Sequence, residues 1–221
     1  MNSLSVSKLS GICYIVGGLL AFIPFLLQIL LGGPPVEGVH IFTDFAQKVV
    51  EGGKLSLFYS ISSVFGFALL TYSMFNLNNL LQKKQVHALL GLGAFLFVIT
   101  QLGLMIGWTI DLSIIFGEKT ANIGNLFMIE MSMYFNFGSL AFIALGIISF
   151  ALSDLNYLNS IFLNVVGTAF VVIGLIFIYT LFTFDDHSSK TILMMFAGVS
   201  IGQIISMVLY ALLGMKLIKE G

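Results

Sequence analysis

The sequence predicts an all-α membrane protein, a bundle of six transmembrane helices with one short amphipathic helix on the extracytoplasmic side. Two observations support this prediction. The 221-residue chain is 58% hydrophobic and only 9% charged, whereas soluble domains carry about 25% charged residues. Its apolar residues also gather in six long runs, each long enough for the roughly 20 residues that cross a hydrocarbon core about 30 Å thick.

The six predicted spans form a single transmembrane domain that covers residues 1–221. We expect them at about 9–31, 55–76, 88–112, 126–152, 158–184 and 191–217. The strands of a membrane barrel would give shorter segments of alternating hydrophobicity, which the sequence does not show. The first run is longer than the apolar region of a secretory signal and lacks a small-residue cleavage pattern, so it is predicted to be an uncleaved helix.

A short helix is predicted at about 38–51, in the loop after the first span. Apolar residues recur there at helical spacing, and Asp44 and Lys48 form an i,i+4 pair. Such a helix either lies on the membrane surface or packs against the bundle. A further interpretation makes it a lid over a pocket.

The content of charged residues, cysteine and histidine excludes several classes of function. The nine basic residues include no arginine, and the formal net charge is -1, so nucleic-acid binding and bidentate phosphate clamps are not expected. The lone Cys13 lies inside the first apolar run, where a small buried hydrophobic residue is expected. Histidines occur only in loops or at segment ends (His40, His87 and His187). Neither a metal site nor a haem is therefore predicted, and no cofactor is expected.

Polar side chains interrupt the apolar runs between residues 88 and 136. Gln101, Trp108 and Asp111 share one face of the third span. Asp111 lies about ten residues past the middle of that span, or roughly 15 Å from the membrane centre. We therefore expect it near the interface, where a carboxylate stays hydrated, and Trp108 fits the aromatic belt at that level.

Glu130 and Tyr134 follow near the start of the fourth span, on the same side of the membrane as Asp111. Two interpretations of Glu130 are open. A carboxylate in the first turns of a helix is stabilised by the helix dipole. Alternatively, Asp111 and Glu130 form a paired-carboxylate mouth that attracts a cation or shares a proton. Asn136 is a further candidate for the lining of such a cavity.

Two glutamines complete the candidate set. Gln28 follows Pro24 by one turn in the first span, where a kink and an amide either line a cavity or serve helix packing. Gln203 begins a polar stripe in the sixth span, near the depth of Gln101. No catalytic or metal-ligating residue is predicted, and the candidate ligand or ion residues are Asp111, Glu130, Gln101, Trp108, Tyr134, Asn136, Gln28 and Gln203.

The alternation of six spans places both termini on one side of the membrane. Five lysines accompany them there, namely Lys8, Lys83, Lys84, Lys216 and Lys219. The other side carries Lys48, Lys54, Lys119 and Lys190, and Lys48 is far from a span end. This bias predicts that both termini lie in the cytoplasm and that the protein resides in the cell membrane.

Two segments carry a family resemblance. Lys8-Leu9-Ser10-Gly11-Ile12-Cys13-Tyr14 opens the first span, and Tyr157-Leu158-Asn159-Ser160-Ile161-Phe162-Leu163-Asn164-Val165-Val166-Gly167 is a turn that leads into a glycine-containing fifth span. Both resemble small prokaryotic integral membrane proteins of six or seven helices, of the domain-of-unknown-function type. Many of these have a basic residue before the fifth helix, which this sequence lacks. The resemblance implies an integral membrane location and a helical bundle, and it assigns no site residue.

Three functions follow from these observations. The first is a non-enzymatic accessory, sensory, or lipid- or apolar-ligand-binding protein, since no catalytic triad or phosphate loop is present and 22 Phe and 10 Met give an adaptable apolar interior. The second is a small transporter or channel with an outward-facing polar cavity near Asp111 and Glu130. The third is an intramembrane enzyme that uses this same pair as acid and base. Expected partners are the lipid bilayer, a membrane protein or a second copy of the chain, and a lipid or small apolar ligand.

Overall fold

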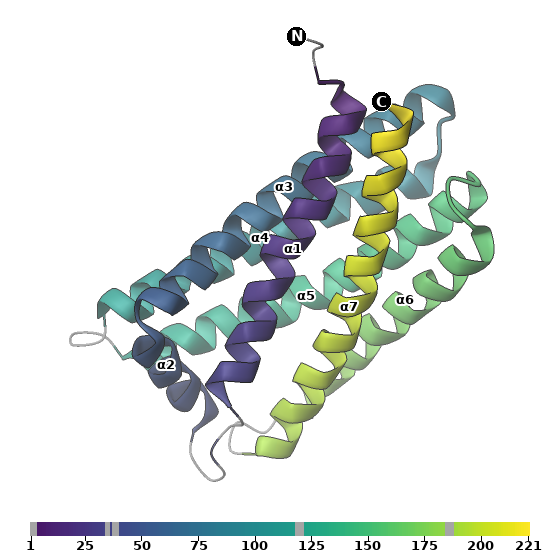
Figure 1. The fold of residues 1–221 in the computed structure, drawn as a ribbon. Coiled ribbons are helices and arrows are strands. Elements are labelled where there is room, and N and C mark those ends of the chain that lie inside the picture. Colours follow the sequence, from purple (N-terminus) through teal and green to yellow (C-terminus); the bar gives the residue numbers. More distant parts are fainter. Residues whose placement is uncertain (1–3, 34–35, 37–39, 118–121, 184–187) are drawn as a thin grey trace.

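The computed structural model describes residues 4–33, 36, 40–117, 122–183 and 188–221, and these residues form seven helices and no strand. Six of the helices are long and apolar enough to cross a membrane, which indicates a multi-pass membrane protein. The predicted all-α bundle of six spans is thereby confirmed (Figure 1). In chain order the helices are α1 (Val6–Gly32), α2 (Ile41–Gly52), α3 (Lys54–Lys84), α4 (Ala88–Gly117), α5 (Ile123–Asp154), α6 (Ser160–Phe182) and α7 (Ser189–Glu220).

Several helices extend beyond the apolar runs that predicted them. The second predicted span stops at residue 76, but α3 continues to Lys84, because Leu77 and Leu81 remain buried against the core while Asn78 and Asn79 are only partly buried. Helix α5 begins at Ile123, where the side chain of Asn122 caps it by accepting a bond from the Asn125 amide. The apolar content of the sequence therefore predicts which segment crosses the membrane, but it does not predict where the helix begins and ends. Positions 38, 39, 119, 184 and 187, which belong to predicted features, lie outside the described residues.

The two ends of the bundle differ in what covers them. Both chain termini lie at one end, here called the terminal end, and α2 lies at the opposite end, the α2 end (Figure 1). Between these ends α1 packs against α3 and α7, and further neighbouring pairs are α3 and α4, α4 and α5, α5 and α6, and α6 and α7, while α2 packs against α5. Figure 1 shows that these long helices extend from the terminal end to the α2 end.

Small residues allow some helix pairs to approach closely. A Cβ atom added at Gly66 of α3 would lie 2.6 Å from the Ala21 amide nitrogen of α1, and one added at Gly11 would lie 2.5 Å from the Gly214 carbonyl oxygen of α7. The Ser73 hydroxyl also donates to the Ser10 carbonyl oxygen across 2.9 Å. Such contacts favour association in a membrane, where apolar burial alone does not drive helices together.

Helix α2 packs against the bundle, which decides between the two positions that the sequence left open. Phe42, Ala46 and Val49 are buried in one cluster with residues of α4, α5, α6 and α7. The Phe45 ring stacks on Phe127 of α5 at a centroid distance of 5.8 Å and meets Phe196 of α7 edge-on at 5.4 Å. The helix thus forms a cover over one end of the bundle.

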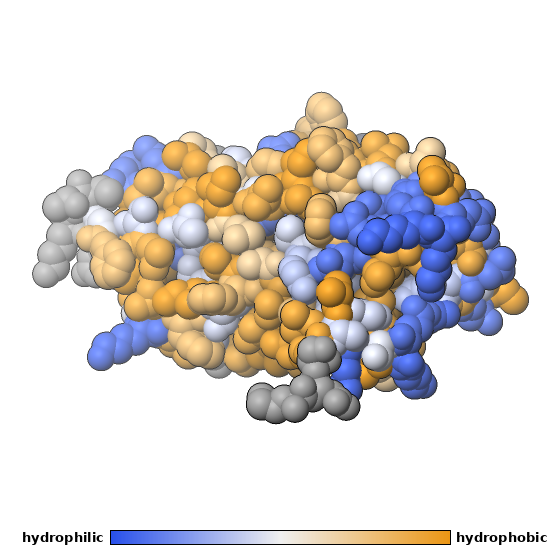
Figure 2. Space-filling view, turned by 90° about the horizontal axis from the view of Figure 1, so that it is seen from above, coloured by the Kyte–Doolittle hydropathy of each residue, from blue (hydrophilic) through white to orange (hydrophobic). Residues whose placement is uncertain are grey.

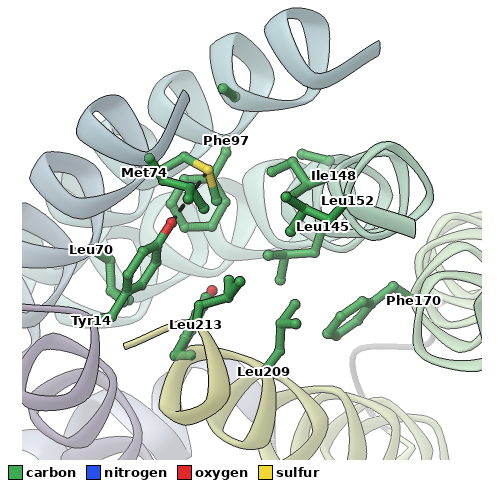
Figure 3. Close-up of a cluster of buried hydrophobic side chains, with 14 of the residues drawn as sticks. Tyr14, Leu70, Met74, Phe97, Leu145, Ile148, Leu152, Phe170, Leu209 and Leu213 are labelled. Atoms are coloured by element: carbon green, nitrogen blue, oxygen red, sulfur yellow. Dashed lines mark hydrogen bonds between the residues drawn. The ribbon is translucent and has the colours of Figure 1, made fainter. Parts of the chain in front are cut away.

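The terminal half of the bundle has a tightly packed core (Figure 3). Met74, Phe97 and Leu213 are fully buried there, together with the Tyr14 ring, whose hydroxyl donates to the Met74 sulfur at 3.5 Å. On the outside, hydrophobic residues cover most of the middle of the face seen in Figure 2, and hydrophilic residues gather toward one end. This distribution suits a bilayer around the middle and water at the ends.

A polar cluster closes the terminal end. The Lys216 ammonium donates to the Tyr157 carbonyl oxygen and lies 4.4 Å from the centre of the Tyr157 ring. The Tyr157 hydroxyl donates to the Glu220 carboxylate at 3.4 Å. Burial, with a smaller contribution from Glu220, raises the pKa of the Tyr157 hydroxyl, so this group remains a donor at neutral pH. The last turn of α7 is thereby tied to the turn between α5 and α6.

Candidate functional site

The α2 half of the bundle encloses a cavity of about 470 Å³, whose wall contains residues of all seven helices. It extends from Phe45 and Lys48 of α2 to Gln101 of α4 and Tyr210 of α7, near the middle of the bundle. Most of the wall is aromatic or aliphatic. A cavity of this size and character is typical of sites for small organic ligands.

Tyr210 closes the inner end of the cavity. Its ring stacks on Tyr14 at a centroid distance of 5.9 Å and meets Phe97 edge-on at 6.3 Å. Both of these neighbours belong to the packed core of the terminal half. The wall therefore ends where the packed core begins.

Asp111 and Glu130 are buried between α4 and α5 near the α2 end. Their side chains are 0% and 1% exposed, so the expectation that Asp111 stays hydrated near the interface is wrong. Depth along a helix does not reveal what covers a residue, and here α2 packs over this end of α4 and α5. The two carboxyl groups are close enough to interact directly, and the Tyr134 hydroxyl lies beside Glu130.

The helix dipole gives a poor account of Glu130. Because α5 begins at Ile123, Glu130 lies about two turns inside the helix, whereas the dipole acts mainly within the first turn. The predicted start of this span, at residue 126, had placed the carboxylate nearer to the helix end. The burial of Glu130 needs another explanation.

The polar atoms of this group lack partners. Within the described residues, Asp111 Oδ1 and Oδ2, Glu130 Oε2 and Tyr134 Oη are buried without a hydrogen bond. Ionised carboxylates only accept hydrogen bonds, so Asp111 and Glu130 can bond to each other only if one of them holds a proton. Otherwise the pair requires a donor or a cation.

Trp108 lies in the interior and not in an interfacial belt. It is 4% exposed, its ring centre lies 5.5 Å from that of Tyr134, and its carbonyl oxygen accepts a hydrogen bond from the Ser60 hydroxyl of α3. The adjacent Gly107 leaves room for the tyrosine, since a Cβ atom there would lie 2.9 Å from Tyr134 Cε1. These contacts hold the Tyr134 ring against α4 and its hydroxyl beside Glu130.

All three candidate glutamines lie on the cavity wall. Gln101 is 2% exposed, and its Oε1 atom has no partner among the described residues. It lies ten residues before Asp111 on α4, or about 15 Å away along the helix. Gln28 lines the wall from α1 and Gln203 from α7. The cavity thus has polar groups at both ends of a largely apolar wall.

Asn136 lies apart from the other candidates. It is exposed and donates to the Ser132 carbonyl oxygen of its own helix at 2.8 Å, and it is not part of the cavity wall. At 3.6 residues per turn, six residues beyond Glu130 correspond to about 240° around the helix. The helical period therefore predicts from the sequence that Asn136 and Glu130 lie on different faces of the helix.

Sequence reasoning missed most of the aromatic wall. Tyr59, Phe127, Phe142 and Phe177 line the cavity, but phenylalanine is spread over every span and no spacing singles these residues out. Asp111, in contrast, supports the site from behind Glu130 without being part of the wall. Within the described residues no group of three His, Cys, Asp or Glu side chains could hold a metal ion.

The fold and the cavity define the class of the protein, a multi-pass helical membrane protein with an internal cavity closed toward the terminal end. Comparisons with protein-family models, with curated proteins and with solved structures found no match. The resemblance to small prokaryotic membrane proteins therefore stays a prediction. The function has to be inferred from the cavity itself.

Proposed function

We propose that the protein binds a small, largely apolar molecule inside its transmembrane bundle, as a sensory or accessory component of the cell membrane. The observation that supports this proposal is the cavity of about 470 Å³, whose aromatic and aliphatic wall carries a few polar groups. Binding sites for small molecules combine these features. If these side chains served only to pack the helices together, they would fill the interior and leave no cavity of this size.

The position of the cavity favours binding over conduction. Gln101 and Tyr210 mark its inner limit, and beyond them Met74, Phe97 and Leu213 are fully buried in the packed core. A channel requires a hydrated path through both halves of the bundle. Ion conduction by the purified protein in a planar bilayer would contradict the proposal.

Trp108 provides a direct measurement of binding, because it is the only tryptophan of the chain and lies on the cavity wall. The protein would be placed in phosphatidylcholine nanodiscs and titrated with 1-dodecanol, a neutral amphiphile. We expect a saturable change in Trp108 fluorescence. A response that only follows the probe content of the bilayer, without saturation, would contradict the proposal.

A cavity-filling variant locates the binding. A Cβ atom at Gly138 would meet only the Phe177 ring, at 3.8 Å, so the side chain of Gly138→Leu has room to extend into the cavity. This substitution should weaken 1-dodecanol binding by roughly tenfold or more. The matched control is Gly198→Leu, at a position on α7 that is not part of the wall and where no described atom lies within 4 Å of an added Cβ. Equal weakening in both variants would place the probe elsewhere.

The proposal includes an orientation, with both termini in the cytoplasm and the α2 end of the cavity outside. It is supported by the excess of lysines on the side of the termini. Reporter fusions to the C-terminus, one active only in the cytoplasm and one only outside it, would test the assignment. Activity of the external reporter would reverse it.

A further inference from the structure

Buried oxygen atoms at the α2 end of the cavity lack hydrogen-bond partners within the described residues. Glu130 Oε2 and Tyr134 Oη belong to residues of the wall, and both Asp111 oxygens lie directly behind them. A carboxylate buried without a partner costs several kcal/mol. A positively charged donor inside the cavity would reach Glu130 and Tyr134 and would remove part of this cost.

An independent observation at the other end of the cavity also points to a ligand. The Gln101 side chain is 2% exposed and lies on the wall, and its Oε1 atom accepts no hydrogen bond from the described residues. An amide oxygen left in this state destabilises the protein unless a donor reaches it. Each end of the cavity therefore has an acceptor oxygen on its wall residues that lacks a donor within the described residues, Glu130 Oε2 at the α2 end and Gln101 Oε1 at the inner end.

The lysine that lies on the described wall of the cavity is already engaged. Lys48 lies on the wall near the α2 end, but its ammonium is 2.9 Å from the Asp44 carboxylate and 4.9 Å from the centre of the Phe45 ring. The Lys48 ammonium therefore interacts with residues of its own helix, α2. The chain also contains no arginine that could reach into the cavity.

The rest of the wall restricts the chemistry of the ligand. Aromatic rings surround the carboxyl groups, among them Trp108, Tyr134 and Phe127, and such rings attract organic cations through their faces. Mg²⁺ and Ca²⁺ take six or more oxygen ligands, which two carboxyl groups and one phenol in an apolar cavity do not supply, and the described residues contain no group of three His, Cys, Asp or Glu side chains for another metal ion. An ammonium group needs only a few acceptors and tolerates an apolar body beside it.

We infer that the cavity binds a lipophilic amine, with its ammonium group at Glu130 and Tyr134, Asp111 behind them, and its apolar body directed toward Gln101 and Tyr210. This inference rests on the proposed function and specifies the class of its ligand. Glu130 is the residue that contacts the ammonium. Asp111 positions Glu130 and contributes negative charge.

A pair of probes of equal length tests the charge requirement. Dodecylamine and 1-dodecanol would be titrated against Trp108 fluorescence in nanodiscs of zwitterionic phosphatidylcholine, which lacks the net negative charge that attracts amines to anionic membranes. We expect dodecylamine to bind roughly tenfold or more tightly than 1-dodecanol. Dodecanoate, with the opposite charge, should bind more weakly than either.

Substitution of the carboxyl groups tests their roles. Glu130→Gln keeps the shape of the side chain and should remove the preference for dodecylamine while leaving 1-dodecanol binding in place. Asp111→Asn should reduce the preference to a smaller extent. Asp154→Asn is the matched control, because the Asp154 side chain is 65% exposed at the terminal end and is not part of the cavity wall. This variant should keep the full preference.

The outcomes separate the inference from the proposed function. Equal binding of both probes to the unmodified protein and to Glu130→Gln would overturn the amine assignment and leave apolar binding intact. Saturable binding of neither probe would overturn both. If NaCl or KCl removes the preference and choline chloride at the same ionic strength does not, the site takes an inorganic cation and the amine assignment is wrong.

Discussion

Tyr14 in the terminal half and Tyr134 in the α2 half both bury their hydroxyl groups, but in different surroundings. The Tyr14 hydroxyl donates to the Met74 sulfur inside a packed core (Figure 3). The Tyr134 hydroxyl has no partner among the described residues and lies at the edge of a cavity, beside two buried carboxyl groups. One half of the bundle is thus filled by packed side chains, and the other contains a cavity bordered by buried oxygen atoms that have no partner among the described residues.

The largest expected effect on the free energy of unfolding comes from replacing a methionine by alanine, in the packed core or on the cavity wall. Met74→Ala should destabilise the protein by about 2–3 kcal/mol, the lower part of the range for buried side chains, because apolar groups remain in hydrocarbon after unfolding. Met74 is fully buried, whereas Met207 lies on the wall of the existing cavity. Met207→Ala should therefore cost about half as much. Reversible unfolding in mixed micelles measures both values, and equal costs would remove the contrast between the halves.

A second comparison uses two glycines of the same helix, α7. A Cβ atom at Gly214 would lie 2.6 Å from the Gly11 carbonyl oxygen, so Gly214→Ala must separate α7 from α1 and should cost about 1–3 kcal/mol. Gly198 faces open space, and Gly198→Ala should be neutral or stabilising by up to about 1 kcal/mol. The same unfolding assay applies. A stable Gly214→Ala variant would mean that the crossing of α1 and α7 is less tight than described.

The third prediction concerns Asp111 and Glu130, and here a substitution is expected to stabilise the protein. Glu130→Gln should raise the free energy of unfolding by about 1 kcal/mol, because it removes one buried charge and offers Asp111 a donor. Glu51→Gln, at an exposed position, should leave stability within about 0.5 kcal/mol. A marked loss of stability in Glu130→Gln would show that the pair is already satisfied within the protein.

The smallest effect is expected at the surface of the terminal end. The Lys84 side chain is 68% exposed, and its ammonium lies 4.0 Å from the Glu220 carboxylate. Lys84→Ala should change stability by less than about 0.5 kcal/mol, since exposed ion pairs contribute little. Lys216→Ala, which also removes the contact with the Tyr157 carbonyl oxygen and ring, should cost about 1 kcal/mol. Similar losses in thermal unfolding for both variants would contradict this ranking.

The fold was predictable because the bilayer imposes it on the sequence. Length and apolar content decide whether a segment crosses a membrane, so all six spans were found. The helical period also placed Gln101, Trp108 and Asp111 on one face of α4, and in the structure this face is buried. These are properties of single helices, and they need no knowledge of neighbouring helices.

The cavity could not be predicted in this way, because it depends on how several helices are placed relative to one another. Asp111 lies near the end of α4, yet α2 packs over that end of the bundle, and its carboxylate is buried. Trp108 is likewise turned inward toward Tyr134. The local pattern of residues around Asp111 does not indicate that a segment distant in sequence packs over it.

The shared wall of the cavity has a consequence for the biogenesis of the protein. Gly18 and Tyr210 both belong to this wall, although they lie near opposite ends of the chain. As the ribosome delivers one span after another to the membrane, the pocket stays incomplete until the last helix has been inserted. A ligand bound at the proposed site would therefore distinguish fully assembled molecules from those that are still being synthesised.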